Sequence, residues 1–278
     1  MERLWPLYIE PILRALEPGR VMQVGAGDGR ASARLLDYCR SAGARADIIE
    51  PRPQPGLEDV LAPFAEVHDF HRLLPLKAIG MAEPPELVLL DGEPNWWTVT
   101  GALNLLRRLA AEQGRSFPGV LVHHTGWPYS RRDMYPNPDA VEERQPYAYQ
   151  GVAPGEPGLV PDGLNGRFAH ALREGGPHNG VLTAVEDFIA AAPFEVRFWS
   201  LPFFNGLGVL VPQARLTPAL QGVIEGFFAP DSLMQAAKAL EAEGVLTQVE
   251  LALAQDRLER RTAALKRARD LLAKAGGV

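Results

Sequence analysis

The sequence is poor in cysteine and in positive charge. Its single cysteine, Cys39, excludes a disulfide framework and a cysteine-rich zinc site. The 278 residues include 28 lysines and arginines against 34 aspartates and glutamates, which gives a formal net charge of −6. A dedicated nucleic-acid-binding protein usually has a basic surplus, so we expect no nucleic-acid partner.

Long apolar runs are also missing. No stretch approaches the ~18 uninterrupted apolar residues of a membrane-spanning helix, and the first residues do not lead into the apolar core of a secretory signal. The 46% of hydrophobic residues is nevertheless enough to form a sizeable core in a chain of this length. We therefore expect a soluble, cytoplasmic protein without a membrane span.

Strand and helix patterns alternate along the first part of the chain. Strand patterns cover residues 20–24, 46–50, 86–91 and 119–123. Helix patterns cover residues 3–17, 31–39 and 97–111, and a short helix is expected within 57–67. This alternation predicts a Rossmann-like α/β fold, with a mostly parallel sheet and helices on both faces. A further helix over 180–192 precedes two strands, 194–200 and 206–211, which we expect to form a terminal antiparallel pair.

Glycine and proline are concentrated in one segment. Residues 126–180 contain 17 of the 27 glycines and 25 prolines taken together. Such a turn-rich segment predicts a long insertion on the substrate side of the domain, with a short helix over 165–173. The domain itself is expected to span residues 1–230.

The tail, residues 231–278, is expected to be one long helix, because residues 231–275 contain a single glycine and no proline. Leu251, Leu258, Leu265 and Leu272 recur every seven residues, although Arg261 interrupts the pattern between them. Two interpretations stay open. One is a solvated helix that packs on its own domain, and the other is a short coiled coil that makes the protein a homo-oligomer.

A glycine-rich turn joins the first strand to its helix. Gly25, Gly27 and Gly29 would let the backbone approach a ligand at the positive end of that helix. Arg30 stands where the dinucleotide fingerprint has its third glycine, which disfavours NAD, and the Gly-Lys-Ser/Thr of a phosphate-binding loop is missing. Glu50, at the end of the second strand, is placed to accept hydrogen bonds from ribose hydroxyls. Together these features predict a nucleotide-like ligand.

Polar residues follow two later strands. Asp91 ends the strand 86–91, and His123 and His124 lie at the end of the strand 119–123. Ligands of open α/β sheets bind at the carboxyl ends of strands, so we expect these three side chains to share one crevice. Such a set could bind a divalent metal or deprotonate a substrate hydroxyl.

The segment 21–29, Glu50 and Asp91 together resemble the class I S-adenosylmethionine-dependent methyltransferases. The resemblance covers roughly residues 1–212 and implies a seven-stranded sheet with a reversed last strand. It implies that Gly25, Ala26 and Gly27 line the amino-acid part of the cofactor and that Asp91 also takes part in its site. It further implies that Glu50 binds the ribose and Asp69 the adenine. Gln23 stands where many members have an acid; it would still hydrogen-bond the cofactor's ammonium group.

Three further segments resemble one bacterial branch, the macrocin-type and cephalosporin-hydroxylase-like O-methyltransferases. They are residues 91–96, 126–135 and 174–188. The branch has histidine at the position of Pro94 and aspartate at the position of His124. These two departures leave open whether a metal is used, and whether the protein binds cofactor without turnover.

Six residues of the insertion are candidates for substrate recognition: Trp127, Tyr129, Arg131, Arg132, Glu174 and Asn179. Trp127, Tyr129, Arg131 and Arg132 would form an aromatic and cationic wall for a sugar or an anionic substrate, or they brace a loop. Glu174 and Asn179 flank a Gly-Gly-Pro turn and would position this segment as a lid. The sequence thus predicts an S-adenosylmethionine-dependent O-methyltransferase. Its substrate would be a hydroxyl of a sugar, glycan or small secondary metabolite. The alternatives are a cofactor-binding scaffold or regulatory subunit, and an NAD-dependent oxidoreductase.

Overall fold

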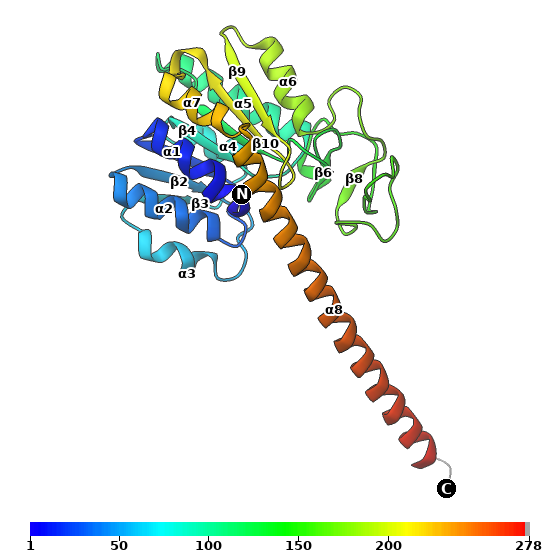
Figure 1. Cartoon of the computed structure of the whole chain (residues 1–278). Helices are drawn as coiled ribbons and strands as arrows, with labels where there is room; N and C mark the ends of the chain where they lie inside the picture. The colour runs from blue at the N-terminus through cyan, green and yellow to red at the C-terminus, as the bar shows by residue number, and fades with distance from the viewer. Residues whose placement is uncertain (276–278) are drawn as a thin grey trace. The chain divides into compact units, whose positions relative to one another are not determined.

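The computed structural model describes residues 1–275, with side chains described through residue 267 and at residue 269. The chain divides into two compact units, residues 1–227 and residues 228–278. The first unit is an α/β domain, and the second contains a single long helix (Figure 1).

The first unit is built on a seven-stranded sheet with the order β3-β2-β1-β4-β5-β10-β9. Its strands, in chain order, are β1 (Arg20–Val24), β2 (Arg45–Ile49), β3 (His68–His71), β4 (Leu87–Leu90), β5 (Gly119–His123), β9 (Val196–Leu201) and β10 (Leu207–Pro212). β1 to β5 are parallel, and β10 is antiparallel to both of its neighbours. The predicted α/β class and the terminal antiparallel pair are therefore confirmed.

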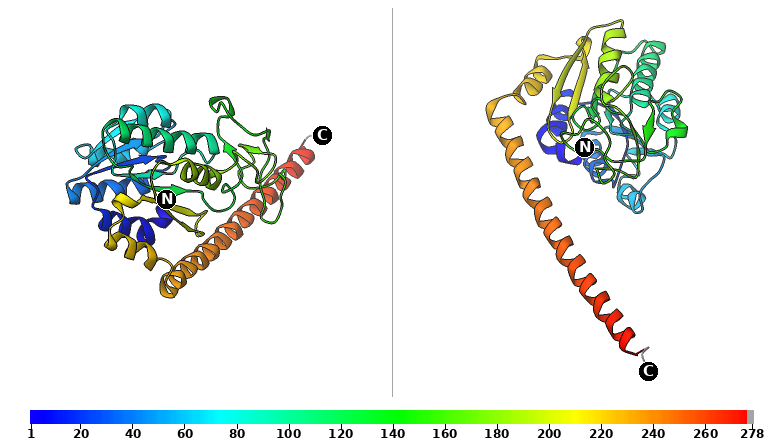
Figure 2. Two further views of the ribbon diagram at one scale, coloured as in Figure 1. Left: turned by 90° about the horizontal axis from the view of Figure 1, so that it is seen from above. Right: turned by 90° about the vertical axis from the view of Figure 1, so that its right-hand side faces the viewer.

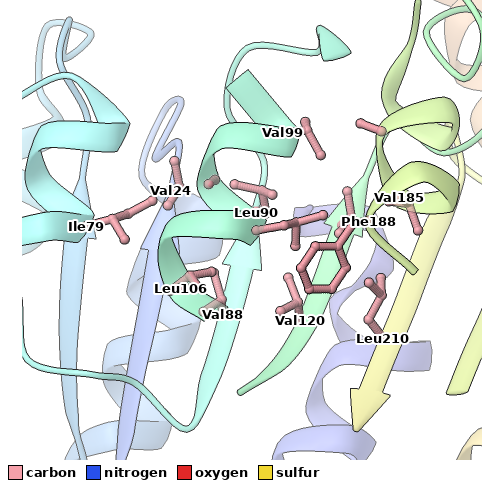
Figure 3. Close-up of a cluster of buried hydrophobic side chains, with 14 of the residues drawn as sticks. Val24, Ile79, Val88, Leu90, Val99, Leu106, Val120, Val185, Phe188 and Leu210 are labelled. Carbon is pink, nitrogen blue, oxygen red and sulfur yellow. The ribbon is translucent and has the colours of Figure 1, made fainter. Parts of the chain in front are cut away.

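Helices cover both faces of this sheet (Figures 1 and 2). One face carries α4 (Pro75–Met81), α5 (Trp96–Glu112) and α6 (Val181–Ala191), and the other carries α1 (Glu10–Leu16), α2 (Arg30–Ala42) and α7 (Pro218–Gly226). The core on the first face is aliphatic. Val88, Val120 and Leu210 of the sheet pack with Leu106 of α5 and Phe188 of α6 (Figure 3). Burial of these side chains is what holds the amphipathic helices on the sheet.

The start of the chain departs from the predicted single helix over 3–17. A 3₁₀ turn (Glu2–Leu4) and a π-helical turn (Trp5–Ile9) precede α1. Pro6 and Pro11 explain this, because proline has no N–H to donate and its ring crowds the carbonyl four residues earlier.

The insertion contains a small antiparallel sheet of order β6-β8-β7. Its strands are β6 (Met134–Tyr135), β7 (Tyr147–Ala148) and β8 (Ala169–Ala171). The helix expected over 165–173 is wrong: β8 lies there, and it hydrogen-bonds to strands on both sides. A turn at Asn165, with a φ of 57°, ends just before it and breaks any helical continuity.

The local sequence patterns predicted neither β3 nor α4. β3 is an edge strand of alternating polar and aromatic residues, His-Asp-Phe-His, and none of its side chains is fully buried. It therefore lacks the apolar run that marks β1, β4 and β5. α3 (Leu57–Leu61) ends before Pro63, as expected.

The second unit contains α8 (Pro230–Ala275), which confirms the predicted tail helix. The side chain of Leu272, part of the predicted heptad pattern, lies outside the described residues. Within the described part of the chain, no helix combines the length and the apolar character needed to cross a membrane.

Candidate functional site

A cavity of about 500 Å³ lies at the carboxyl ends of β1, β4 and β5. It brings together the turn residues 25–27, Glu50, Asp91 and the pair His123 and His124. Its size falls within the range of about 300–1,000 Å³ that is typical of small-molecule sites. The residues expected to bind cofactor, apart from Asp69, and those expected to perform chemistry therefore line one cavity.

Glu50 is tied to the glycine-rich turn. Its Oε2 accepts a hydrogen bond from the backbone N–H of Ala26 at 3.0 Å, and its Oε1 accepts one from the N–H of Arg52 at 3.1 Å. These two bonds fix the carboxylate at the end of β2. Each carboxylate oxygen can accept a second hydrogen bond, so both remain available to a pair of hydroxyls.

Gln23 presents an unpaired acceptor to the same cavity. Its side chain is 2% exposed, and its Nε2 donates to the carbonyl of Gly25 at 3.0 Å. Its Oε1 is buried and has no hydrogen-bond partner. A buried polar atom without a partner costs free energy unless a ligand or water satisfies it. Gln23 is thus set up to accept a hydrogen bond from a bound donor such as an ammonium group.

Gly25 and Gly27 serve different purposes, which predicts different outcomes for the same substitution. A Cβ at Gly25 (φ 88°) would lie 2.0 Å from the backbone oxygen of Asp91, whereas one at Gly27 (φ 56°) would meet no atom within 4 Å. We expect Gly25→Ala to lower the free energy of unfolding by about 3 kcal/mol or more, and Gly27→Ala by about 1 kcal/mol. Chemical denaturation of the two variants checks this, and equal losses would contradict it.

His123 is held between two acceptors. Its Nδ1 lies 2.6 Å from Asp91 Oδ1, and its Nε2 lies 2.8 Å from the carbonyl oxygen of Phe204. A carbonyl and a carboxylate only accept, so both ring nitrogens donate in this arrangement. His123 therefore offers no lone pair to a substrate proton. It acts as a hydrogen-bond donor that holds Asp91 in place.

Asp91 lies against three nitrogen-containing groups, two imidazole rings and an amino group. Besides His123, its Oδ2 lies 2.8 Å from the amino group of Met1, and its Oδ1 lies 3.5 Å from His124 Nε2. Burial by itself would raise the pKa of Asp91, but the charge and hydrogen bond of His123 and the charge of the amino group outweigh it. The pKa is held well below its ordinary value. Asp91 is therefore a carboxylate that stabilises cations in the cavity.

His124 lies next to His123 on the same side of the chain. Successive side chains of a strand point to opposite faces, but the backbone turns into the left-handed region at His124 (φ 67°), so both rings reach Asp91 and stack at 4.0 Å. Its Nδ1 is buried without a partner. Burial and the neighbouring charge of His123 lower the pKa of His124 to about 3. The ring is therefore neutral near pH 7, with Nε2 facing Asp91 and the Nδ1 lone pair free.

This neutral histidine predicts a pH dependence of stability. His124 would bind a proton near pH 6.5 in the unfolded chain but only near pH 3 in the folded one, so the unfolded state holds more protons between these values. Stability is expected to fall as the pH drops from about 6.5 towards 3, by up to about 1.4 kcal/mol per pH unit. His124→Gln should flatten this slope in denaturant titrations. An unchanged slope would contradict the assignment.

Asp91, His123 and His124 each place one donor atom within 4.8 Å of the others, as a metal site requires. However, both nitrogens of His123 are committed to acceptors, and Pro94 occupies a further position where the resembled branch has histidine. The donor set as arranged does not fit a resident metal ion, and we derive no chemical step through one.

Asp69 lies away from this group. It is the second residue of β3, well before the carboxyl end of the strand, and its Oδ2 accepts from Arg45 Nη2 at 3.2 Å. It is not among the residues that line the cavity. The structure therefore places Asp69 outside the cavity, although the resemblance implies that this residue contacts the adenine.

The cationic and aromatic wall expected from the insertion is also not found in the cavity. Arg131 makes a two-fold contact with Glu186, and the Tyr129 hydroxyl accepts from Asn165 Nδ2 at 2.6 Å. Arg132 is 2% exposed and donates to the carbonyls of Ala171 and Pro157. These side chains brace the insertion.

The other three candidates also lie outside the cavity. Asn179 is buried; its Oδ1 accepts from the N–H of Asp133, and its Nδ2 donates to two carbonyls. Glu174 lies 3.9 Å from Arg132, and Trp127 is 39% exposed. None of the three lines the cavity.

Asp133 is an organising residue of the site that was not among the candidates predicted from the sequence. It is 1% exposed, and its Oδ1 accepts from the N–H groups of Trp96 and Gly180, both at 2.7 Å. Its Oδ2 accepts from the Tyr135 hydroxyl at 2.7 Å. Asp133 thus joins the starts of α5 and α6 to β6. No local pattern in the sequence marks this role, because the three donors come from residues 96, 135 and 180.

The cavity also has apolar walls, which were not predicted from the sequence. Pro94, Met134, Pro136 and Phe204 give an apolar surface, with Asn205 beside them. Arg52 and Glu93 also line the cavity and pair with each other, with Arg52 Nη2 2.7 Å from Glu93 Oε1. Burial raises the pKa of Glu93, and Arg52 offsets part of that effect.

No protein-family model and no curated protein sequence matches the chain. Several solved structures are similar to it. An SAH-bound methyltransferase from Podospora anserina is 14% identical, with a TM-score of 0.44, over 73% of this chain and 76% of that one. The O-methyltransferase TomG of Streptomyces achromogenes, in complex with SAM, is 14% identical with a TM-score of 0.44, over 76% and 78%. A 1,6-didemethyltoxoflavin-N1-methyltransferase from Burkholderia thailandensis is 13% identical with a TM-score of 0.38, over 73% and 77%.

The strand order is an observation independent of these alignments. Five parallel strands are followed by β10, which is antiparallel between β5 and β9. This is the seven-stranded sheet with a reversed last strand that the sequence resemblance implied. The chain therefore has the Rossmann-like fold that the sequence resemblance implied.

Proposed function

We propose that the protein is an S-adenosylmethionine-dependent O-methyltransferase. The observation that carries the proposal is the shared cavity, in which a ribose-binding carboxylate and the glycine-rich turn line the same space as a carboxylate and two histidines. Cofactor and acceptor must meet within one enclosed volume for a methyl group to pass between them.

The residues present fit the cofactor. Glu50 keeps a free acceptor position on each oxygen for the two ribose hydroxyls, and Gln23 Oε1 is a buried acceptor suited to the ammonium group. The open space at Gly27 admits the amino-acid chain close to the backbone. When bound, the cofactor supplies an electrophilic methyl group on a sulfonium.

The acceptor hydroxyl would be oriented by His124. The Nδ1 lone pair of this neutral ring is the one unpaired nitrogen of the two histidines and can accept the O–H hydrogen bond. Nδ1 would take up the hydroxyl proton as the oxygen gains the methyl group, and the cofactor would leave as the neutral thioether S-adenosylhomocysteine when its sulfur–methyl bond breaks. Asp91, next to Nε2, stabilises the imidazolium that results. His123 holds the Asp91 carboxylate in place.

The acceptor is proposed to be an uncharged hydroxyl compound, a sugar, glycan or small secondary metabolite. The side of the cavity next to His124 is formed by Pro94, Met134 and Phe204, with Asn205 as a polar contact. Arg131 and Arg132, the cations that would have recognised an anionic acceptor, are engaged elsewhere, Arg131 with Glu186 of α6 and Arg132 with a carbonyl of the insertion. The arrangement therefore favours apolar and hydrogen-bonding recognition over charge.

A second candidate is a cofactor-binding scaffold without turnover. It is favoured by one observation: the low pKa of His124 makes this ring a weak base. The scaffold and the enzyme share the cofactor site and differ only in the fate of the methyl group.

Calorimetry tests the cofactor class, and methyl transfer tests the enzyme. We expect S-adenosylmethionine and S-adenosylhomocysteine to bind and NAD not to bind, because Asp28 and Arg30 pair with each other at the start of α2, where NAD would need a glycine and room for its pyrophosphate. NAD binding without S-adenosylmethionine binding would overturn the proposal. Cofactor binding with no methyl transfer to any member of a hydroxyl-compound panel would favour the scaffold.

A further inference from the structure

Along α8, one stripe of mostly apolar residues recurs at spacings of alternately three and four. We call this stripe the seam. One position of the heptad, a, is occupied by Ala237, Gly244, Leu251, Leu258 and Leu265, and the other, d, by Leu233, Leu240, Thr247, Ala254 and Arg261. The leucines of this seam are between 36% and 72% exposed. Exposed leucines in a heptad seam are typical of a helix that pairs with another helix.

The leucines change position half-way along the helix. In the first half they occupy d (Leu233, Leu240), and in the second half they occupy a (Leu251, Leu258, Leu265). When two helices run antiparallel, an a residue of one faces a d residue of the other. A sequence whose leucines move from d to a is therefore matched to its own reversed copy.

We propose that α8 pairs with the α8 of a second copy of this chain as an antiparallel coiled coil. The register has its two-fold axis at the midpoint of Pro230–Ala275, so the helices overlap along their full length of about 69 Å. In this register Leu265 faces Leu240, Leu258 faces Thr247 and Leu251 faces Ala254. The inference does not depend on the proposed function.

The same register also accommodates Arg261, the charged residue that interrupts the apolar seam. Arg261 faces Gly244 of the partner helix, where the space beside the backbone holds no other atom within 4 Å. The largest residue of the seam thus lies against the smallest. In a parallel pair in register, Arg261 would face its own copy, and two like charges would meet in the seam.

Charge also favours the antiparallel direction. Residues 230–252 carry four acidic and one basic residue, and residues 253–275 carry seven basic and three acidic residues. An antiparallel pair places each acidic half against a basic half, whereas a parallel pair places like against like. At the edge of the seam Glu250 lies opposite Arg257 of the partner helix, and symmetry provides this pair twice.

Sedimentation of the full chain tests the association. We expect a dimer that Leu258→Asp dissociates, raising the dissociation constant more than about a hundredfold, because the variant buries an unpaired charge. Leu253→Asp, which adds the same charge to an exposed leucine outside the seam, should leave the dimer intact. A monomer, a larger assembly, or equal effects of the two variants would overturn the proposal.

Cysteine cross-linking tests the direction, in a Cys39→Ser background. We expect Thr247→Cys mixed with Leu258→Cys to give a disulfide between the two variants, and neither variant to link to itself, because each new thiol lies about 16 Å along the axis from its own copy. Self-linking of either variant would show a parallel pair. Glu250→Lys should weaken the dimer about threefold, and adding Arg257→Glu should restore it; no restoration would overturn this register.

Discussion

Replacing Glu50 by alanine is expected to weaken the binding of S-adenosylmethionine by about a hundredfold. The substitution removes a charged acceptor for two ribose hydroxyls, each such hydrogen bond contributing about 1.5 kcal/mol or more. It also releases the N–H of Ala26, which Oε2 of Glu50 holds at 3.0 Å, and so loosens the glycine-rich turn. The affinity of Glu50→Gln, which keeps an acceptor but loses the charge, should lie between that of Glu50→Ala and that of the unmodified protein. Calorimetric titration with the cofactor measures all three proteins.

The matched control is Glu66→Gln, which removes the same charge from an exposed side chain that does not line the cavity. Its affinity should equal that of the unmodified protein. If Glu50→Ala binds S-adenosylmethionine as tightly as Glu66→Gln does, the cofactor does not use this carboxylate.

Replacing Asp91 by asparagine is expected to lower the methyl-transfer rate by at least about a hundredfold. The substitution removes the negative charge that lies 3.5 Å from His124 Nε2 and 2.6 Å from His123 Nδ1. Without it, the imidazolium formed on His124 loses its stabilising charge, and the hydrogen bond from His123 is left with a neutral acceptor. Cofactor affinity should change less than the rate. Single-turnover measurements at saturating S-adenosylmethionine separate the two.

The fold itself offers a control for this variant. Asp47 is 1% exposed and makes a similar contact, 2.8 Å from His71 Nε2, but it does not line the cavity. Asp47→Asn removes a buried aspartate–histidine pair without touching the proposed chemistry. It should affect stability and spare the rate per folded molecule. If both variants lose the same rate, Asp91 acts only through the fold.

The path of the main chain could largely be predicted from local patterns. The strands β1, β4 and β5 are short apolar runs, and runs of this kind form buried parallel strands whatever surrounds them. β3 could not be found in this way, because its residues gain a strand conformation only from hydrogen bonds to β2. The same holds for β8, which pairs on both sides within the insertion.

The candidate site, too, could be predicted only in part. Glu50, Asp91, His123 and His124 could be placed in one crevice because parallel strands bring their carboxyl ends to the same edge. The roles of the two histidines could not be separated, since only the Phe204 carbonyl, 81 residues away, commits the second nitrogen of His123. Arg131 and Arg132 look like ligand-binding residues in the sequence, and only the tertiary structure shows that they pair with Glu186 and with the carbonyl of Ala171.

The sequence by itself determined which residues begin and end the sheet, the glycine-rich turn with its carboxylate, and the heptad seam of the tail. Each of these is a short-range pattern whose physical meaning lies in neighbouring residues. The tertiary structure decided which nitrogen keeps its lone pair, which cations are free and which walls close the cavity. Those properties depend on hydrogen bonds and burial between segments far apart in the chain, and no local pattern records them.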